Sequence, residues 1–114
     1  MRTKLFTTKE HLHLNLKSKW FDMILSGVKK QEYRDISDYW ESRFAKIFPK
    51  HFKGEMYHPI VETIIFSNGY AKDRRQFEIE RKGAYRGTGR EDWGAEKNRH
   101  YFVLQLGNVL QSNC

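Results

Sequence analysis

Apolar and polar side chains alternate over residues 11–17, and this period of two predicts a strand with its leucines on one face. From Lys19 to Ser26 the apolar positions recur at helical spacing, so we expect a short helix there. Ser18 is a residue type that often caps a helix N-terminus, and Gly27 is the type that most often ends a helix. Residues 29–35 are predicted to form a second strand.

A second helix is predicted from Ser37 or Asp38 to about Phe48. Both prolines of the chain fall within residues 49–59, which we expect to form a loop. The buried side of this helix would be formed by Tyr39, Trp40, Phe44, Ile47 and Phe48.

The second half of the chain is dominated by strands. Residues 60–66 are β-branched and apolar, which is typical of a buried strand, and Asn68-Gly69 indicates a turn. Residues 75–82 alternate again, residues 83–94 are rich in glycine and are expected to form a loop, and residues 101–110 close the chain as a long strand. This order predicts an α+β domain built as a small β-barrel of about five to six strands, with two short helices near one mouth.

A chain of 114 residues has the length of one domain, and the predicted elements place its core at about residues 11–110. The formal net charge is +7, and it is unevenly distributed. Residues 1–30 and 72–90 carry most of the excess of lysine and arginine. Such an imbalance favours phosphate-bearing partners, although a solvated basic surface that keeps the protein soluble is the simpler interpretation.

Cysteine usage and hydropathy argue against disulfide-containing, metal-binding and membrane proteins. Cys114 is the single cysteine, which excludes an internal disulfide and a cysteine metal site. No stretch approaches the roughly 20 apolar residues that span a bilayer, so we expect a cytoplasmic protein that binds no membrane. His11 and His13 share a strand face without a third ligand at diagnostic spacing, so we expect neither a metal nor a cofactor.

Four residues at fixed spacing follow the first predicted helix. Gly27, Lys29, Glu32 and Arg34 form the pattern GxKxxExR. This pattern resembles the signature of ASCH domains, which are small members of the PUA-like β-barrel superfamily. The segments Phe66–Tyr70 and Asp92–Ala95 and the closing strand are also similar to those of small phage- and bacteria-borne ASCH proteins, and the resemblance covers about residues 11–110.

The resemblance implies a barrel with a cleft beside the first helix, where the motif residues gather. ASCH domains are thought to bind RNA. Some members are reported as ribonucleases, and others as amidohydrolases that remove an acyl group from a modified cytidine. The amidohydrolase branch carries threonine where this chain has Glu32, so the hydroxyl nucleophile is missing at that position.

The chemistry of the motif can also be read from its spacing. Glu32 and Arg34 are two residues apart in a strand and therefore share a face. Lys29 can join them only from an irregular turn before the strand, and we predict that it does. In a cleft, Glu32 would accept hydrogen bonds from exocyclic amino groups, and Arg34 would bind phosphate or a carbonyl edge. An internal ion-pair cluster that ties helix to strand is the structural alternative.

Two further segments are candidate RNA contacts. In the first, Asn68 belongs to the predicted turn, Tyr70 could stack on a base, and Lys72 and Arg74 could contact phosphates. A hairpin turn with a half-buried tyrosine is the alternative there. In the second, Arg86 lies in the glycine-rich segment 83–90, which lacks the spacing of a phosphate-binding loop and is predicted to be a flexible RNA-contacting loop or a plain surface loop.

These observations lead to three hypotheses. In the first, the protein binds RNA or a modified nucleoside in a cleft lined by Lys29, Glu32 and Arg34. In the second, it is a hydrolase of RNA or of an acylated nucleoside, with Lys29 as base or nucleophile and Glu32 as its proton partner. In the third, it is a protein-interaction module with an aromatic face. The sequence leaves the oligomeric state open.

Overall fold

The computed structural model describes residues 12–44 and 62–114. Its elements in chain order are β1 (Leu12–Asn15), α1 (Ser18–Leu25), β2 (Gln31–Asp35), α2 (Asp38–Arg43), β3 (Glu62–Ser67), β4 (Gln76–Thr88), a 3₁₀ turn η1 (Glu91–Trp93) and β5 (His100–Ser112). The five strands form one sheet in the order β1-β3-β4-β5-β2. Only β1 and β3 run parallel to each other, and the other neighbours are antiparallel.

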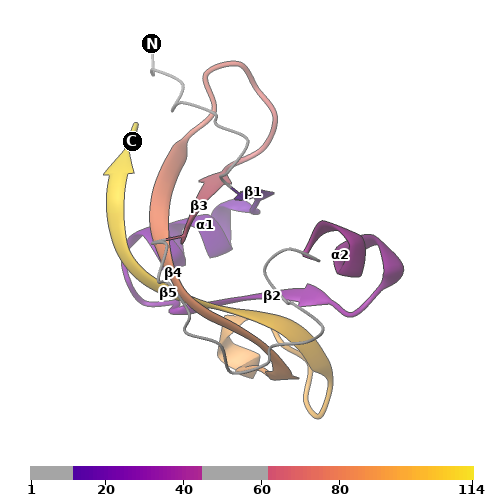
Figure 1. Cartoon of the computed structure of the whole chain (residues 1–114). Helices are drawn as coiled ribbons and strands as arrows, with labels where there is room; N and C mark the ends of the chain where they lie inside the picture. Colours follow the sequence, from indigo (N-terminus) through magenta and orange to yellow (C-terminus); the bar gives the residue numbers. More distant parts are fainter. Residues whose placement is uncertain (1–11, 45–61) are drawn as a thin grey trace, which may run out of the picture.

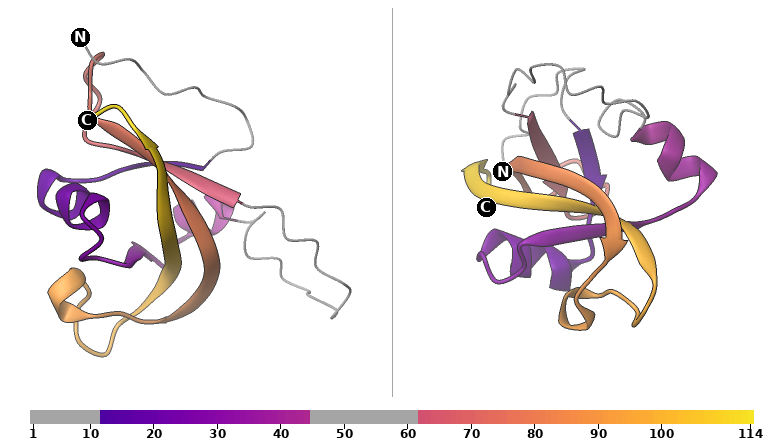
Figure 2. Two further views of the ribbon diagram at one scale, coloured as in Figure 1. Left: turned by 90° about the vertical axis from the view of Figure 1, so that its left-hand side faces the viewer. Right: turned by 60° about the horizontal axis from the view of Figure 1, so that its bottom comes forward.

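The sheet curls into a half-barrel because β4 and β5 are long and strongly bent (Figure 1). Their pairing contains register shifts between Glu78 and Gly83, and such irregularities increase the local bend and twist of a sheet. Figure 2 shows the two strands curving together around the domain. The predicted α+β class and barrel-like architecture with two short helices are therefore confirmed.

The concave side of the sheet holds the main core. Helix α1 closes this core with Phe21, whose ring packs edge-on against Phe77 of β4 with centroids 4.8 Å apart. Phe44, just after α2, packs edge-on against Phe102 of β5. The other buried members of the core are Leu14, Leu16, Ile24, Ile64, Phe66, Ile79, Leu104 and Leu106.

The two edge strands, β1 and β2, approach each other across the open side of the half-barrel. The Arg34 side chain on β2 reaches the opposite edge and donates through Nη2 to the backbone oxygen of Asn15 on β1, at 2.7 Å. We call this open side the seam. A cleft can form at the seam, because β1 and β2 are not paired with each other there.

The structure corrects several predictions made from the sequence. Ser18 is the first residue of α1 and not its cap, which is Lys17. Tyr39 is exposed, so it does not belong to the buried side of α2. The second predicted helix is described only to Phe44, and the predictions that involve His11, the end of that helix, the loop 49–59 and the start of the strand at Ile60 lie outside the described residues.

The largest correction concerns the glycine-rich segment. Residues 83–88 do not form a loop, because they continue β4 and pair with residues 100–105 of β5. Glycine lowers strand propensity, but the apolar partner strand β5 supplies pairing and packing that outweigh it. Gly83 also lies close to the facing strand: a Cβ there would come within 2.9 Å of the Gln105 side chain.

Candidate functional site

The turn between α1 and β2 positions the motif. Gly27 has φ +87°, and its N–H bonds to the carbonyl of Ile24, so it ends the helix in the left-handed conformation as predicted. The Lys29 N–H then bonds back to the Met23 carbonyl at 2.9 Å. Lys29 therefore lies in an irregular turn that turns its side chain toward β2, and this prediction is confirmed.

Lys29, Glu32 and Arg34 form one ion-pair cluster, which we call the charged cluster. Lys29 Nζ donates to Glu32 Oε1 at 2.9 Å, and Arg34 Nη2 donates to Glu32 Oε2 at 2.8 Å. Lys29 is 2% exposed and Glu32 is 5% exposed, whereas the Arg34 side chain retains 17% exposure. At such low exposure each charge needs its partner, because a buried ion that is left unpaired lowers the free energy of unfolding.

The position of Glu32 changes its predicted role. Its Oε1 also accepts from the Tyr33 backbone N–H at 3.1 Å, so both carboxylate oxygens already accept hydrogen bonds from the protein. Glu32 therefore orients the two cations. Hydrogen bonding by this carboxylate to an exocyclic amino group, which the sequence suggested, would compete with these internal partners.

Aromatic rings surround the cations of the charged cluster. Lys29 Nζ lies 4.6 Å from the centre of the Trp20 ring, and the Arg34 guanidinium lies 4.9 Å from that of Trp40. Among the described residues, Arg34 Nε and Asn15 Oδ1 are buried without a hydrogen-bond partner. The seam thus retains unused polar capacity next to the cluster.

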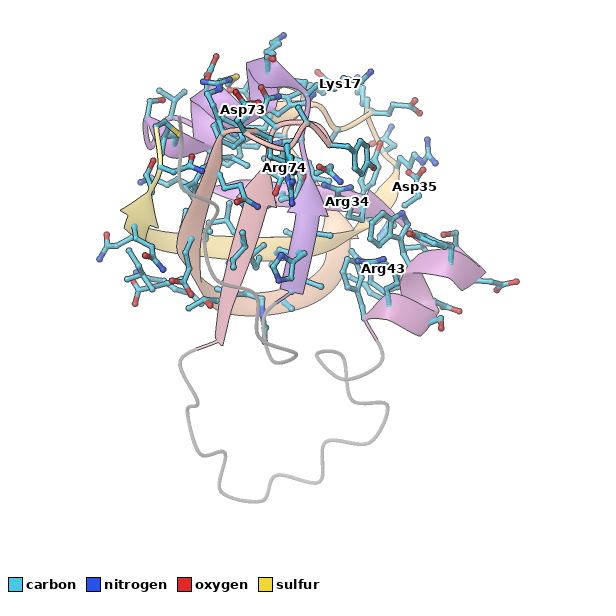
Figure 3. The ribbon with its side chains drawn as sticks, turned by 90° about the horizontal axis from the view of Figure 1, so that it is seen from above. Lys17, Arg34, Asp35, Arg43, Asp73 and Arg74 are labelled. Atoms are coloured by element: carbon cyan, nitrogen blue, oxygen red, sulfur yellow. The ribbon has the colours of Figure 1, made fainter. Side chains whose placement is uncertain are left out.

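The charged cluster contributes to the wall of a cleft of about 420 Å³, a size common for small-ligand sites. The cleft lies at the seam, between the end of β1, the start of α1, β2 and the segment around η1. Figure 3 shows Lys17, Arg34 and Asp35 along this side of the molecule. The lining residues are Asn15, Leu16, Lys17, Trp20, Lys29, Glu32, Tyr33, Arg34, Asp35, Trp93, Gly94, Glu96, Arg99 and Tyr101.

The segment 89–99 forms the outer wall of the cleft and is fixed at several points. The Arg90 N–H donates to the Tyr33 hydroxyl at 3.0 Å, and Arg99 pairs with Asp35 at 2.9 Å. Gly89 is required at its position, because a Cβ there would lie 2.5 Å from the Tyr33 ring. Gly94 has φ +101° and packs against Trp20. The wall is therefore held in place before any ligand arrives.

Two pKa shifts follow from these contacts. Burial raises the pKa of the Tyr33 phenol, and this effect exceeds the opposing effect of its hydrogen bond from Arg90. The negative charge of Asp35 is the main cause that raises the pKa of Arg99, and the hydrogen bond to Glu96 adds to it. Arg99 therefore stays cationic at the cleft. Lys17 also lines the cleft and forms no ion pair with any residue that the structure describes.

The other predicted site residues lie away from the cleft. Asn68 donates to the Leu16 carbonyl, just after β1, and to the Ser18 hydroxyl of α1, while Tyr70, Lys72 and Arg74 belong to the loop between β3 and β4. Tyr70 is 84% exposed, so the alternative of a half-buried tyrosine in this turn is wrong. Arg86 lies on β4, where its guanidinium is 3.7 Å from Glu41 and covers the Phe102 ring.

The motif alone did not reveal most of the wall. Trp20 falls in the first predicted helix and Tyr33 in the second predicted strand, but the pattern marked neither as a site residue. Arg99 and Tyr101 gave no signal because they are distant from the motif in sequence. Trp93 lies in the Asp92–Ala95 segment that contributed to the family resemblance, and this was the one usable hint.

Comparison with models of protein families gave no match, and comparisons with curated proteins and with solved structures gave none either.

Proposed function

We propose that this protein is an ASCH-type domain of the PUA-like superfamily and that it binds a nucleoside or nucleotide unit of RNA in the cleft at the seam. The proposal rests above all on one observation. The charged cluster of Lys29, Glu32 and Arg34 lines a cleft whose other walls carry Trp20, Tyr33 and Trp93. Aromatic faces beside cations are the combination that binds a base together with its phosphate or carbonyl groups.

The polar groups of the cleft favour a ligand rich in acceptors. Both oxygens of Glu32 already accept hydrogen bonds from the protein, while Lys17 forms no ion pair and Arg34 Nε has no hydrogen-bond partner among the described residues. Phosphate oxygens and base carbonyls can accept from these donors. Arg99 adds a further cation at the mouth, although it is shared with Asp35 and Glu96.

Binding is supported better than hydrolysis by the contacts of Lys29. A hydrolase would use this side chain as base or nucleophile, yet its Nζ is bonded to Glu32 and faces the rings of Trp20 and Tyr33. The side chain would have to break its ion pair with Glu32 and leave the two rings before its Nζ could act on a substrate. The hydrolase hypothesis requires that the Lys29→Ala variant lose all turnover while remaining folded.

Exposed apolar residues give less support to a protein-interaction module. Within the described part of the chain, the large ones are spread over the α1–β2 turn, the β2–α2 connection, α2, the β3–β4 loop, β4 and β5. They are Val28, Ile36, Tyr39, Tyr70, Tyr85, Val109 and Leu110. No helix of the described residues is long and apolar enough to cross a membrane.

A thermal-shift screen tests the proposal. Nucleoside monophosphates and modified nucleosides are added to the wild-type protein, and a ligand that binds only the folded state raises the melting temperature. Trp93→Ala removes one wall without touching the charged cluster, and it should abolish the shift. Tyr70→Ala removes an exposed aromatic outside the cleft and should leave the shift unchanged. A ligand-induced shift that survives Trp93→Ala would place the binding site elsewhere.

A further inference from the structure

The loop of residues 68–75, between β3 and β4, presents an aromatic side chain to solvent. The Tyr70 residue is 84% exposed to solvent, although hydrogen bonds hold the base of its loop in place. Lys72 is exposed beside it and Arg74 is half-exposed. Lys17 and Lys19, at the start of α1, are also exposed. We call Lys17, Lys19, Tyr70, Lys72 and Arg74 the basic ridge.

Hydrogen bonds attach this loop to the wall of the cleft. Asn68 Nδ2 donates to the Leu16 carbonyl at 3.0 Å, and the Leu16 N–H donates to the Ser67 carbonyl at 2.8 Å. At the other end of the loop, Arg75 pairs with Asp22 of α1 at 2.8 Å. Leu16 lines the cleft, so the loop and the cleft share one structural support.

The basic ridge continues directly from the cleft. Lys17 belongs to both, and Lys19 Nζ lies 4.6 Å from the centre of the Trp20 ring, which lines the cleft. Figure 3 shows Lys17, Asp73 and Arg74 gathered at the same end of the molecule. The ridge therefore carries four cations against the single acidic residue Asp73, since Asp22 is already paired with Arg75.

We propose that the basic ridge binds the phosphate backbone of a single-stranded polynucleotide, with Tyr70 stacking on one of its bases. The polynucleotide would continue from the nucleotide in the cleft past Lys17 toward Lys72 and Arg74. Its position along the ridge therefore rests on the proposed function of the cleft. Exposed cations interleaved with an aromatic ring are how single-strand binders hold a chain without reading its sequence. RNA and DNA share this chemistry.

An anionic membrane surface fits the ridge less well. Tyr70 is flanked by Gly69 and Ala71, so the loop presents one ring and no larger apolar surface that could enter a bilayer. When the cleft binds one nucleotide of a polynucleotide, the neighbouring nucleotides have a high effective concentration at the adjacent ridge. A membrane surface has no such link to the cleft.

Fluorescence anisotropy with labelled twelve-nucleotide oligouridine and oligothymidine tests the proposal on the full chain. Lys72→Glu should weaken binding of the oligonucleotide severalfold and lower the dependence of affinity on salt, because one phosphate contact is lost. Lys82→Glu is the matched control, since Lys82 is an exposed lysine on β4 outside the ridge. Tyr70→Ala should weaken binding by about fivefold or more, and Tyr70→Phe should restore it.

Uridine 5′-monophosphate, which is too short to reach Tyr70 and Lys72 from the cleft, separates this proposal from that of the cleft. Its affinity should be unchanged in Lys72→Glu and in Tyr70→Ala. Oligonucleotide binding that responds equally to Lys72→Glu and Lys82→Glu, or to neither, would overturn the ridge even if the monophosphate binds. Binding that depends on the ridge without any binding of the monophosphate would support the ridge and remove the cleft. Adsorption to phosphatidylserine vesicles with no affinity for either oligonucleotide would overturn the ridge proposal in favour of a membrane surface.

Discussion

The charged cluster and the basic ridge are both rich in cations, but they hold them in opposite ways. In the cluster, Lys29 and Arg34 are largely buried and share one carboxylate, Glu32. In the ridge, Lys72 is exposed and has no ion-pair partner among the described residues. The same residue types therefore form a buried ion-pair cluster at one place and an exposed cationic surface at the other.

The difference shows what a buried cluster contributes to a binding site. The ion pairs and the Asn15 contact fix Arg34 across the seam, so its guanidinium is positioned before a ligand binds. Exposed lysines are not fixed in this way, but they attract a polyanion and release its counterions. We expect the cluster to govern stability and selectivity, and the ridge to govern affinity for long strands.

The largest expected effect is the loss of the shared carboxylate. Glu32→Ala leaves two cations close together in a buried site, and we expect the free energy of unfolding to fall by about 3–5 kcal/mol. Lys72→Ala should change it by less than about 0.5 kcal/mol, because surface substitutions usually do. Urea denaturation measures both values. A loss below about 1 kcal/mol for Glu32→Ala would mean that the cluster is not energetically coupled.

A smaller effect is expected where the loop of the basic ridge is attached to the wall of the cleft. Asn68→Ala removes the hydrogen bond to the Leu16 carbonyl and the contacts with Ser18 and Arg75. We expect the free energy of unfolding to fall by about 1–2 kcal/mol, since a partly buried carbonyl loses its partner. Oligonucleotide affinity should fall as well, because the loop that carries Tyr70 loses its support. If the variant is measurably destabilised and its oligonucleotide affinity is unchanged, the hydrogen bonds of Asn68 do not contribute to binding.

The smallest effect concerns the alkaline titration of the cleft wall. Burial raises the pKa of Tyr33, so the unfolded chain loses this proton at lower pH than the folded protein does. The contribution of Tyr33 to stability is complete below about pH 10 and is lost as the pH rises through its folded value. The ultraviolet difference titration between wild type and Tyr33→Phe should show a phenol that ionises later than exposed tyrosines. Ionisation at the ordinary pH would show that the wall is open to water.

The local parts of the site were predictable from sequence. Gly27 could be placed at a helix end because few other residues adopt a positive φ, and the period of two placed Glu32 and Arg34 on one face. The irregular position of Lys29 followed from the same count. These features depend on short segments of the chain, where backbone geometry restricts the possibilities.

Long-range features were not predictable in the same way. Residues 83–88 look like a loop until β5 pairs with them, and only that pairing brings the segment 89–99 over Trp20. Arg99 and Tyr101 join the cleft through the same event. The spacing of residues along one chain carries no record of such contacts.

The most direct test of the central claim uses the three tryptophans as reporters. Their indole N–H signals in a ¹⁵N-labelled sample are assigned by Trp→Phe substitution, and uridine 5′-monophosphate or a short oligouridine is titrated in. Trp20 and Trp93 line the cleft, whereas Trp40 does not, so Trp20 and Trp93 should shift together while Trp40 moves little. Saturable binding that leaves Trp20 and Trp93 unmoved would contradict a nucleotide site at the seam, as would the absence of any shift at millimolar ligand.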